Sequence, residues 1–440
     1  MSLSYPPHFH PEQSPLWMGA VSEALGRVAP AARRYCEIGC GSGFGATLLA
    51  AANPDMQVVG IDLDAGHIAA AQDRAAKAGL SNVRFYHADI ADFSVDESFD
   101  YITCHGVLSW VAPATRTAIA DFIARHLAPG GLAAVQYMSA PGGAAFAAFH
   151  ALFRSLAHRP DPVAEGLAAL VAMRDAGAGF FQMHPHAGAT LDSLLQAPKG
   201  YVAHEYLSAD FAALPCNQVF DLFRTMGVHW IGSATPVENI DAASLPGACA
   251  HIIAQAPDPA REVLKDIARN QALRYDLFSH PAQPLGDHAH LDVLRQQEWA
   301  LLPGVPTCLP QHFALNSRIG PVAADPRLFS PMLSALAQGP RCFAWLERLP
   351  PFSGRPGLLN QVLQMAMWAR MVHPAVTVRD ASAAARLNRL LLTANHCDVP
   401  ALAAPGFGSG LALDPATLAA LLAGGSDPPL RAVLCLETPV

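Results

Sequence analysis

The sequence predicts an α/β protein built on a doubly wound parallel sheet, and three observations support this fold class. An apolar stretch at 35–38 is followed by glycines at 39, 41 and 43 and then by strong helix formers at 46–52. Strand and helix patterns alternate five times along the first third of the chain, which is typical of βαβ units with right-handed crossovers. Ionisable side chains also recur where the predicted strands end.

The chain begins with a predicted extended arm at 5–15, because four prolines fall in this segment. His8 and His10 have the spacing of metal ligands, but no partner cluster accompanies them. We therefore interpret them as part of an exposed turn and expect no dedicated metal site. Apolar residues then recur at helical spacing over 16–28, which predicts a helix beside the sheet.

Four further strands are predicted after the glycine loop, at 56–62, 82–89, 99–105 and 132–138. Helices are predicted between them, including those at 68–78 and 115–127. In an open parallel sheet, ligands bind beyond the carboxyl ends of the strands. The sequence places ionisable groups at those ends: Glu37, Asp62, Asp89 and His105. This coincidence predicts a ligand site along one edge of the sheet.

The glycine loop predicts close contact between backbone and ligand, because no Cβ stands in the way. The helix behind it offers free N–H groups and the positive end of its dipole. Gly41-x-Gly43-x-x-Ala46, with Asp62 further on, also satisfies a relaxed dinucleotide pattern. Glu37, two residues before the loop, suits a cationic ligand better than a pyrophosphate.

The segment from Glu37 to Gly43 resembles the first motif of class I methyltransferases that use S-adenosylmethionine, which carries a sulfonium and an ammonium group. Together with the chemistry, the resemblance implies that Asp62 accepts the ribose hydroxyls, while Asp89 and the Ile90 backbone hold the adenine amino group. The loop is expected to wrap the amino-acid part of the cofactor. The full predicted cofactor set is Glu37, Gly39, Cys40, Gly41, Ser42, Gly43, Asp62, Leu63, Asp89, Ile90, Cys104 and His105.

Three segments, 105–111, 201–207 and 269–276, resemble bacterial methyltransferases that carry a methyltransferase regulatory domain. This group includes the rickettsial protein lysine methyltransferases that modify an outer-membrane protein, and the resemblance extends from about residue 5 to the C-terminus. It implies a protein lysine or peptide acceptor, a homodimer formed through an inserted helical region, and a C-terminal winged helix. One departure is that Pro141-Gly142 is followed by Gly143, where relatives tend to have an aromatic residue.

Methyl transfer requires the nucleophile and the methyl carbon to be held in line in a dry site. We predict His105 as a polar catalytic residue, with Trp110 and Tyr137 as an aromatic wall around the acceptor. Trp110 is equally compatible with a core aromatic. His204, Glu205 and Tyr206 are predicted on the substrate side, although anchoring of the insertion also explains them.

The remaining segments predict an interrupted cofactor domain. An alanine-rich helical insertion at 143–198 is expected over the cofactor mouth, after which the sheet resumes with a strand at 228–232 and a last strand at 248–254. Further predicted elements are helices at 217–225, 261–278, 328–349, 356–372 and 382–393, a linker at 281–310, and strand-and-loop material at 399–413. The expected division is 1–30 (arm and helix), 31–142 (cofactor core), 143–210 (insertion), 211–280 (sheet completion and regulatory segment) and 281–440 (C-terminal domain).

Composition excludes several classes of partner. Of the 440 residues, 52% are hydrophobic and 15% charged, which is typical of a globular protein. A net charge of −8 without a basic run argues against nucleic acid, and no apolar stretch is long enough for membrane insertion. Nine cysteines without a Cys-x-x-Cys pair, and an amino terminus without a signal-peptide pattern, predict a cytoplasmic protein.

Three functions remain open at this point. The first is a protein or peptide N-methyltransferase, and the second is a small-molecule N- or O-methyltransferase of secondary metabolism. The third is a non-catalytic module that senses S-adenosylmethionine or its product S-adenosylhomocysteine. A nicotinamide oxidoreductase is a distant fourth.

Overall fold

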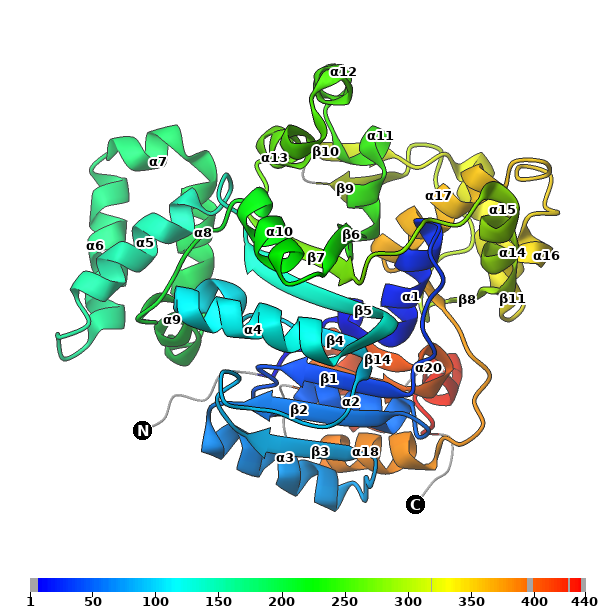
Figure 1. The fold of residues 1–440 in the computed structure, drawn as a ribbon, viewed down its shortest axis with the longest axis horizontal. Helices are drawn as coiled ribbons and strands as arrows, with labels where there is room; N and C mark the ends of the chain where they lie inside the picture. Colours follow the sequence, from blue (N-terminus) through cyan, green and yellow to red (C-terminus); the bar gives the residue numbers. More distant parts are fainter. Residues whose placement is uncertain (1–6, 318, 394–398, 426–427, 437–440) are drawn as a thin grey trace.

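A seven-stranded sheet forms the centre of the computed structural model, which describes residues 7–317, 319–393, 399–425 and 428–436 (Figure 1). Its strand order is β3-β2-β1-β4-β5-β7-β6. The first five strands are parallel, whereas β7 runs antiparallel to both β5 and β6. The strands are β1 (Arg34–Ile38), β2 (Gln57–Asp62), β3 (Val83–His87), β4 (Phe99–Cys104), β5 (Leu127–Met138), β6 (His229–Ser233) and β7 (Leu273–Ser279). The predicted α/β fold class is confirmed.

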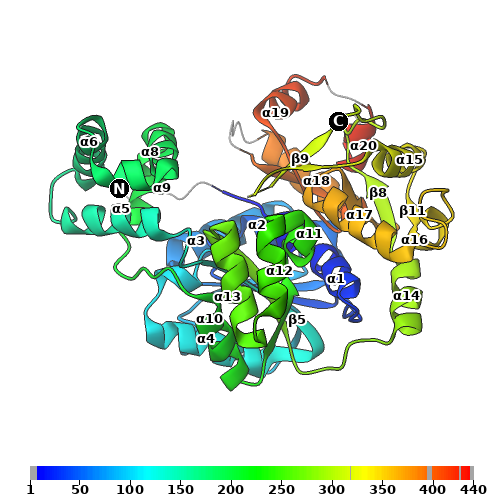
Figure 2. The same cartoon turned by 90° about the horizontal axis from the view of Figure 1, so that it is seen from above.

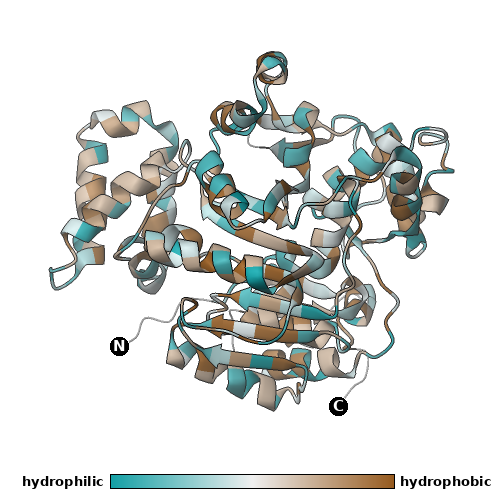
Figure 3. Cartoon of the chain, in the orientation of Figure 1, coloured by the Kyte–Doolittle hydropathy of each residue, from teal (hydrophilic) through white to brown (hydrophobic). Residues whose placement is uncertain are grey.

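Helices cover both faces of this sheet. On one face lie α1 (Pro15–Ala24), α2 (Phe44–Ala52) and α3 (Ala65–Lys77), and on the other α4 (Pro113–His126) and α10 (Cys216–Thr225). Neighbouring residues of a strand point to opposite faces, so Tyr35 packs in the first core and Cys36 in the second. Because both faces are covered, hydrophobic stretches run through the central strands, with polar residues such as Arg34 and Glu37 in β1 (Figure 3).

The insertion forms a helical body that projects from one side of the sheet (Figure 1). It has its own small core, which includes Phe149, Phe153, Leu191 and Val202. Its helices are α5 (Ala144–Ser155), α6 (Pro162–Asp175), α7 (Gly179–Met183), α8 (Pro185–Gln196) and α9 (Lys199–Tyr206). After it, the chain returns to the sheet through β6 and β7.

The sequence prediction was wrong in the segment that completes the sheet. The predicted strand at 248–254 is helix α12 (Gly247–Gln255). The predicted helix at 261–278 is instead α13 (Asp258–Arg269) followed by strand β7. Asn270 ends α13 in the left-handed conformation, with φ of 47°. Asparagine tolerates this conformation well and commonly follows a helix, so Asn270 was the overlooked stop signal.

The C-terminal region lies on the side of the sheet away from the insertion (Figure 2). It contains a three-stranded sheet of order β11-β8-β12 and two hairpins, β9-β10 and β13-β14. The predicted helix at 328–349 ends at Leu336, and the strand β11 and a short helix α16 follow it. The winged-helix assignment stays a prediction. The elements are α14 (Asp287–Gln296), β8 (Glu298–Leu301), β9 (Ala314–Ser317), β10 (Gly320–Ala323), α15 (Pro326–Leu336), β11 (Arg341–Cys342), α16 (Phe343–Leu346), α17 (Pro356–Trp368), β12 (Val372–Pro374), α18 (Ser382–Thr393), β13 (Ala401–Ala404), β14 (Ser409–Ala412), α19 (Pro415–Leu422) and α20 (Pro428–Val433).

The C-terminal region packs directly on helix α2. Every residue of α2 is buried, because the sheet covers one side of this helix while α18, β13 and β14 cover the other. The predicted N-terminal arm, of which residues 5 and 6 lie outside the described part, enters beside these elements and forms the short 3-10 helix η1 (Pro11–Gln13). Within the described residues, no helix is both long and apolar enough to cross a bilayer.

Candidate functional site

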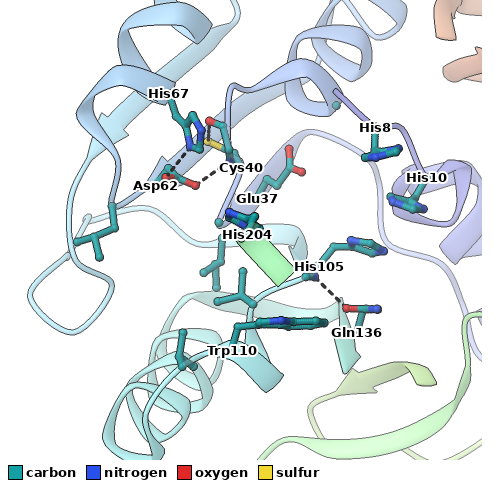
Figure 4. Close-up of a pocket in the computed structure, with 18 of the residues that line it drawn as sticks. His8, His10, Glu37, Cys40, Asp62, His67, His105, Trp110, Gln136 and His204 are labelled. Carbon is teal, nitrogen blue, oxygen red and sulfur yellow. Dashed lines mark hydrogen bonds and ion pairs between the residues drawn. The ribbon is translucent and has the colours of Figure 1, made fainter. Parts of the chain in front are cut away.

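A cavity of about 1280 Å³ opens at the carboxyl ends of β1, β2, β3, β4 and β5. This volume exceeds the roughly 300–1,000 Å³ of a typical site for one small ligand, so the cavity has room for two reactants. Figure 4 shows its polar side chains, which come from the sheet, from the N-terminal arm and from the insertion. Most of the predicted site residues line it: Glu37, Gly39, Cys40, Gly41, Ser42, Asp62, Leu63, Asp89, Ile90, His105, Trp110, His204, Glu205 and Tyr206.

The glycine loop turns tightly between β1 and α2. Gly39, Gly41 and Gly43 all have φ between 55° and 71°, a range that favours glycine. A Cβ on Gly39 would overlap Val107, and one on Gly43 would lie 2.6 Å from Ala71 Cβ. A Cβ on Gly41 would meet nothing within 4 Å, so this glycine borders open space. Gly39 and Gly43 therefore keep the loop against the protein, while Gly41 faces the cavity.

Asp62, at the end of β2, is tied to this loop. Its Oδ2 accepts the Gly41 N–H at 2.7 Å, and its Oδ1 accepts the Asp64 N–H at 2.9 Å. Helix α3 is capped by Asp64, whose Oδ1 accepts the backbone N–H groups of Gly66 and His67. Asp62 is therefore not a helix cap, and its carboxylate stays at the wall of the cavity.

Glu37 differs from an ordinary surface carboxylate in its burial, its hydrogen bonding and its pKa. Its side chain is only 7% exposed, and its Oε1 accepts a hydrogen bond of 3.3 Å from Gln13 Nε2. The other oxygen, Oε2, is buried without a partner within hydrogen-bonding distance among the described residues. Burial raises the pKa of Glu37 to about 8, while Gln13 and the Ala46 backbone act in the opposite direction. A buried acceptor of this kind fits a ligand that brings a cationic donor, such as an ammonium group.

His105 lies across the cavity from Asp62 (Figure 4). Its ring stacks on that of His10 with 3.9 Å between centroids, and it meets Tyr275 edge-on at 5.5 Å. Burial, and then the nearby His10 and His8, lower the pKa of His105 well below its usual value. The imidazole is thus neutral at pH 7 and able to accept a hydrogen bond.

Aromatic side chains form the wall next to the insertion. Trp110 meets Phe146 edge-on at 6.2 Å, and Phe146 in turn stacks on Tyr206 at 4.3 Å. The Trp110 indole Nε1 is buried and has no partner among the described residues. Trp110 is therefore more than a core aromatic, because its ring lines the cavity and its N–H group has no acceptor among the described residues.

Three predicted site residues do not line the cavity. Tyr137 is fully buried on the opposite face of β5, where its hydroxyl donates to Asp276 Oδ2 at 2.7 Å. Its neighbour Gln136 occupies the predicted place and accepts the Gly106 N–H at 2.9 Å, because side chains alternate along a strand. Cys104 belongs to the core under the sheet, and Gly43 serves packing.

Sequence reasoning missed the N-terminal arm and strand β7. His8, His10, Glu12 and Gln13 all border the cavity, which corrects the exposed-turn interpretation of the arm. Tyr275 also lines it, with a buried hydroxyl that has no hydrogen-bond partner among the described residues. The arm has no periodic pattern to mark it, and Tyr275 was assigned to a helix. No group of three or more His, Cys, Asp or Glu side chains suited to a metal occurs within the described part of the chain.

Comparisons with known proteins agree with this geometry. Residues 36–131 match the model of a methyltransferase domain, and residues 198–280 match that of a predicted methyltransferase regulatory domain. An uncharacterised protein of Synechocystis is 29% identical over 86% of this chain and 77% of its own length. Trans-aconitate 2-methyltransferase of Methylobacterium nodulans is 33% identical over 39% of this chain and 63% of its own length.

A solved structure shares nearly the whole fold. PKMT2 from Rickettsia typhi, solved in complex with AdoHcy, superposes with a TM-score of 0.71, covering 96% of this chain and 88% of the rickettsial chain at 18% identity. The likeness therefore includes the insertion and the C-terminal region. The matched segments thus carry a methyltransferase domain and a predicted methyltransferase regulatory domain on a Rossmann-like methyltransferase fold, and the chain is an S-adenosylmethionine-dependent methyltransferase.

Proposed function

We propose that this enzyme transfers a methyl group to an amine of a protein or peptide, with the lysine side chain as the acceptor. The observation that carries this proposal is the charge of the cavity wall. Among the described residues that line the cavity, the carboxylates Glu205 and Asp210 stand apart from the glycine loop, Glu12 is paired with Arg370, and none of the lining residues is Lys or Arg. An ammonium-bearing acceptor is attracted by such a wall.

The same wall argues against a carboxylate acceptor of the kind named for the trans-aconitate methyltransferases. Carboxylate substrates are usually held by Arg or Lys through charge-assisted hydrogen bonds. The described lining residues provide no such cation, and a dicarboxylate or tricarboxylate would face like charges.

For the cofactor, we propose roles that follow the geometry. Asp62 accepts the ribose hydroxyls, Asp89 and the Ile90 backbone hold the adenine, and the Glu37 carboxylate receives the ammonium group of the amino-acid part. When bound, S-adenosylmethionine supplies an electrophilic methyl carbon with a neutral leaving group. Its fit is supported by the unpartnered Glu37 Oε2 and by the open space in front of Gly41.

For the acceptor, we propose that Trp110 and Tyr206 exclude water and that His105 orients the nucleophile. After the acceptor ammonium has released one proton to water, the neutral imidazole of His105 accepts a hydrogen bond from the resulting amine, which directs the nitrogen lone pair toward the methyl position. The stacked His10 restricts rotation of the His105 ring. His204 and Glu205, from α9, contribute to the far rim of the cavity.

The acceptor class is tested by incubating the full chain with methyl-tritiated S-adenosylmethionine and a bacterial lysate. We expect label in macromolecules, released as methyl-lysine on acid hydrolysis and lost when lysine amines are acetylated beforehand. Label in small molecules would support the second candidate, a small-molecule methyltransferase. Binding of S-adenosylhomocysteine without any transfer would support a sensor. The D62A variant, which is expected to bind the cofactor more weakly, serves as the control with reduced labelling at a limiting cofactor concentration.

We also propose that the helical insertion, within the domain division given by the sequence, mediates a homodimer. Three apolar side chains of the insertion are exposed to solvent: Met173 on α6 (56%), Met183 on α7 (79%) and Leu195 on α8 (42%). Exposed apolar side chains of this kind support a surface that contacts a second subunit. Light scattering at micromolar concentration is expected to give twice the mass of the chain. A monomer would contradict this proposal.

A further inference from the structure

The N-terminal arm reaches the cofactor site through one buried amide. Gln13 is 4% exposed, and its Nε2 donates to Glu37 Oε1 at 3.3 Å. Among the described residues, this is the side chain that hydrogen-bonds to Glu37, and together with the Ala46 backbone it orients the carboxylate. His10, the residue directly before η1, stacks on His105. The arm therefore touches both proposed halves of the site.

The arm is in turn held by the C-terminal region. Arg370, which follows α17, places its Nη2 at 2.5 Å from Glu12 Oε1. The guanidinium also lies over the Trp17 ring, 4.6 Å from its centroid. Arg370 adopts a left-handed backbone conformation, with φ of 57°, which is costly for a residue other than glycine. The surrounding structure must therefore stabilise this backbone conformation. In this conformation the Arg370 side chain points at the arm.

A second contact joins the arm to the same region. Phe9 is 8% exposed and packs so closely on β14 that a Cβ on Gly410 would come within 2.8 Å of its ring. Phe9 thus faces the C-terminal region, Glu12 pairs with that region from the edge of the cavity, and His10 and Gln13 line the cavity. Because the arm has only one turn of 3-10 helix, these contacts determine its position.

We propose that Arg370 is a positioning residue for cofactor binding: it fixes Glu12, and through the arm it sets the hydrogen bond from Gln13 that orients the Glu37 carboxylate toward the cavity. The C-terminal region then tunes the affinity for S-adenosylmethionine without touching it. This inference rests on the proposed role of Glu37, which E37Q tests separately.

The first experiment measures the affinity of the full chain for S-adenosylhomocysteine by isothermal titration calorimetry. R370A is expected to weaken binding by roughly threefold to tenfold, as expected for a lost charge pair and a loosened arm. R370K, which keeps the charge, recovers part of the loss. The matched control is R295A, because Arg295 pairs with Glu347 at 3.0 Å in the same region and both pairs have nearly equal exposure, 42% and 19% against 42% and 20%.

A double-mutant cycle separates positioning from general damage. If Arg370 acts through Gln13, then R370A adds little to the loss already caused by Q13A. Additive losses, or equal effects of R370A and R295A, would overturn the proposal. A uniform fall in melting temperature without a change in affinity would overturn it as well.

The pH dependence of the affinity provides a further test, because a purely structural effect of R370A would leave this dependence unchanged. Loss of the Gln13 donor raises the pKa of Glu37 further. The pH at which the affinity rises is therefore expected to be higher in Q13A and in R370A than in the parent protein, and unchanged in R295A. An unshifted profile in R370A contradicts the proposal. The ionisable groups around Glu37 are Asp62 on β2, Cys40 in the loop, Tyr35 and Cys36 on β1, and Tyr275 on β7.

Discussion

Glu37, the proposed partner of the cofactor ammonium, illustrates how a buried carboxyl lowers the stability of the ligand-free protein. Its pKa is about 8 in the folded chain, against 4.5 as its ordinary value. The folded state therefore keeps a proton that the unfolded state releases, so stability falls as the pH rises from 4.5 to about 8. The corresponding penalty is on the order of a few kcal/mol above that range. A cationic ligand removes it on binding.

We expect E37Q to melt at a higher temperature than the parent protein at a pH of about 9, and at nearly the same temperature at about 5. The reason is that glutamine carries no charge to desolvate. The same variant is expected to bind S-adenosylhomocysteine more weakly, because its amide cannot pair with the ammonium group. Differential scanning fluorimetry at both pH values checks the first effect. A melting temperature that drops equally at both would contradict it.

Replacing Asp62 by alanine is expected to reduce the affinity for S-adenosylhomocysteine by roughly tenfold or more, since hydrogen bonds to a charged group contribute about 1.5–3 kcal/mol each. The variant also loses the bond that ties Gly41 to β2. Calorimetric titration measures the loss. D73A, which removes only an exposed partner of Lys77 on α3, is the control and is expected to bind normally. Unchanged affinity of D62A would remove Asp62 from the site.

At the scale of elements, the strand–loop–helix unit was predictable because its signals are local. Glycines that end an apolar strand, followed by helix formers, leave few alternatives. The strand ends converge because parallel strands share one edge, and this places Glu37, Asp62, Asp89 and His105 around one cavity. Tyr137 was misassigned because the face of a strand that reaches a cavity depends on register, which no local pattern gives.

Two glycines of the loop are expected to respond differently to alanine. G39A forces its methyl group into Val107 and is expected to destabilise the protein strongly, whereas G41A meets open space and costs only about 1 kcal/mol of backbone strain. G41A nevertheless loses cofactor affinity, because the methyl group occupies the cavity. Melting curves and titrations distinguish the two effects. If G41A bound S-adenosylhomocysteine as the parent does, the loop would not contact the cofactor.

At the scale of the whole molecule, the sheet depends on a segment that returns after the insertion. Sequence patterns predicted this return and the strand at 228–232, which is β6, but they missed β7 because only the turn at Asn270 separates it from α13. The contacts of the arm with Arg370 and β14 were beyond prediction, since they join residues about 360 and 400 positions apart.

We expect R274A to destabilise this returning segment by about 3–5 kcal/mol, because it leaves buried carboxylates without their cation. Arg274 is 2% exposed and pairs with Asp276 at 2.8 Å, with Asp266 at 2.5 Å and with Glu262 at 3.1 Å. Scanning calorimetry is expected to show a large fall in melting temperature. R327A, which removes an exposed pair with Asp325, is the control. Similar curves for both variants would show that the buried network contributes little.

The placement of β7 between β5 and β6 has a consequence for synthesis of the protein. While the nascent chain leaves the ribosome, β5 has β4 on one side but no partner on the other, because the insertion is made before β7. An unpaired apolar strand edge is a template for misassociation. A chain released early, before residue 273, would keep that edge of β5 unpaired, so this edge stays open to misassociation until β7 has been made.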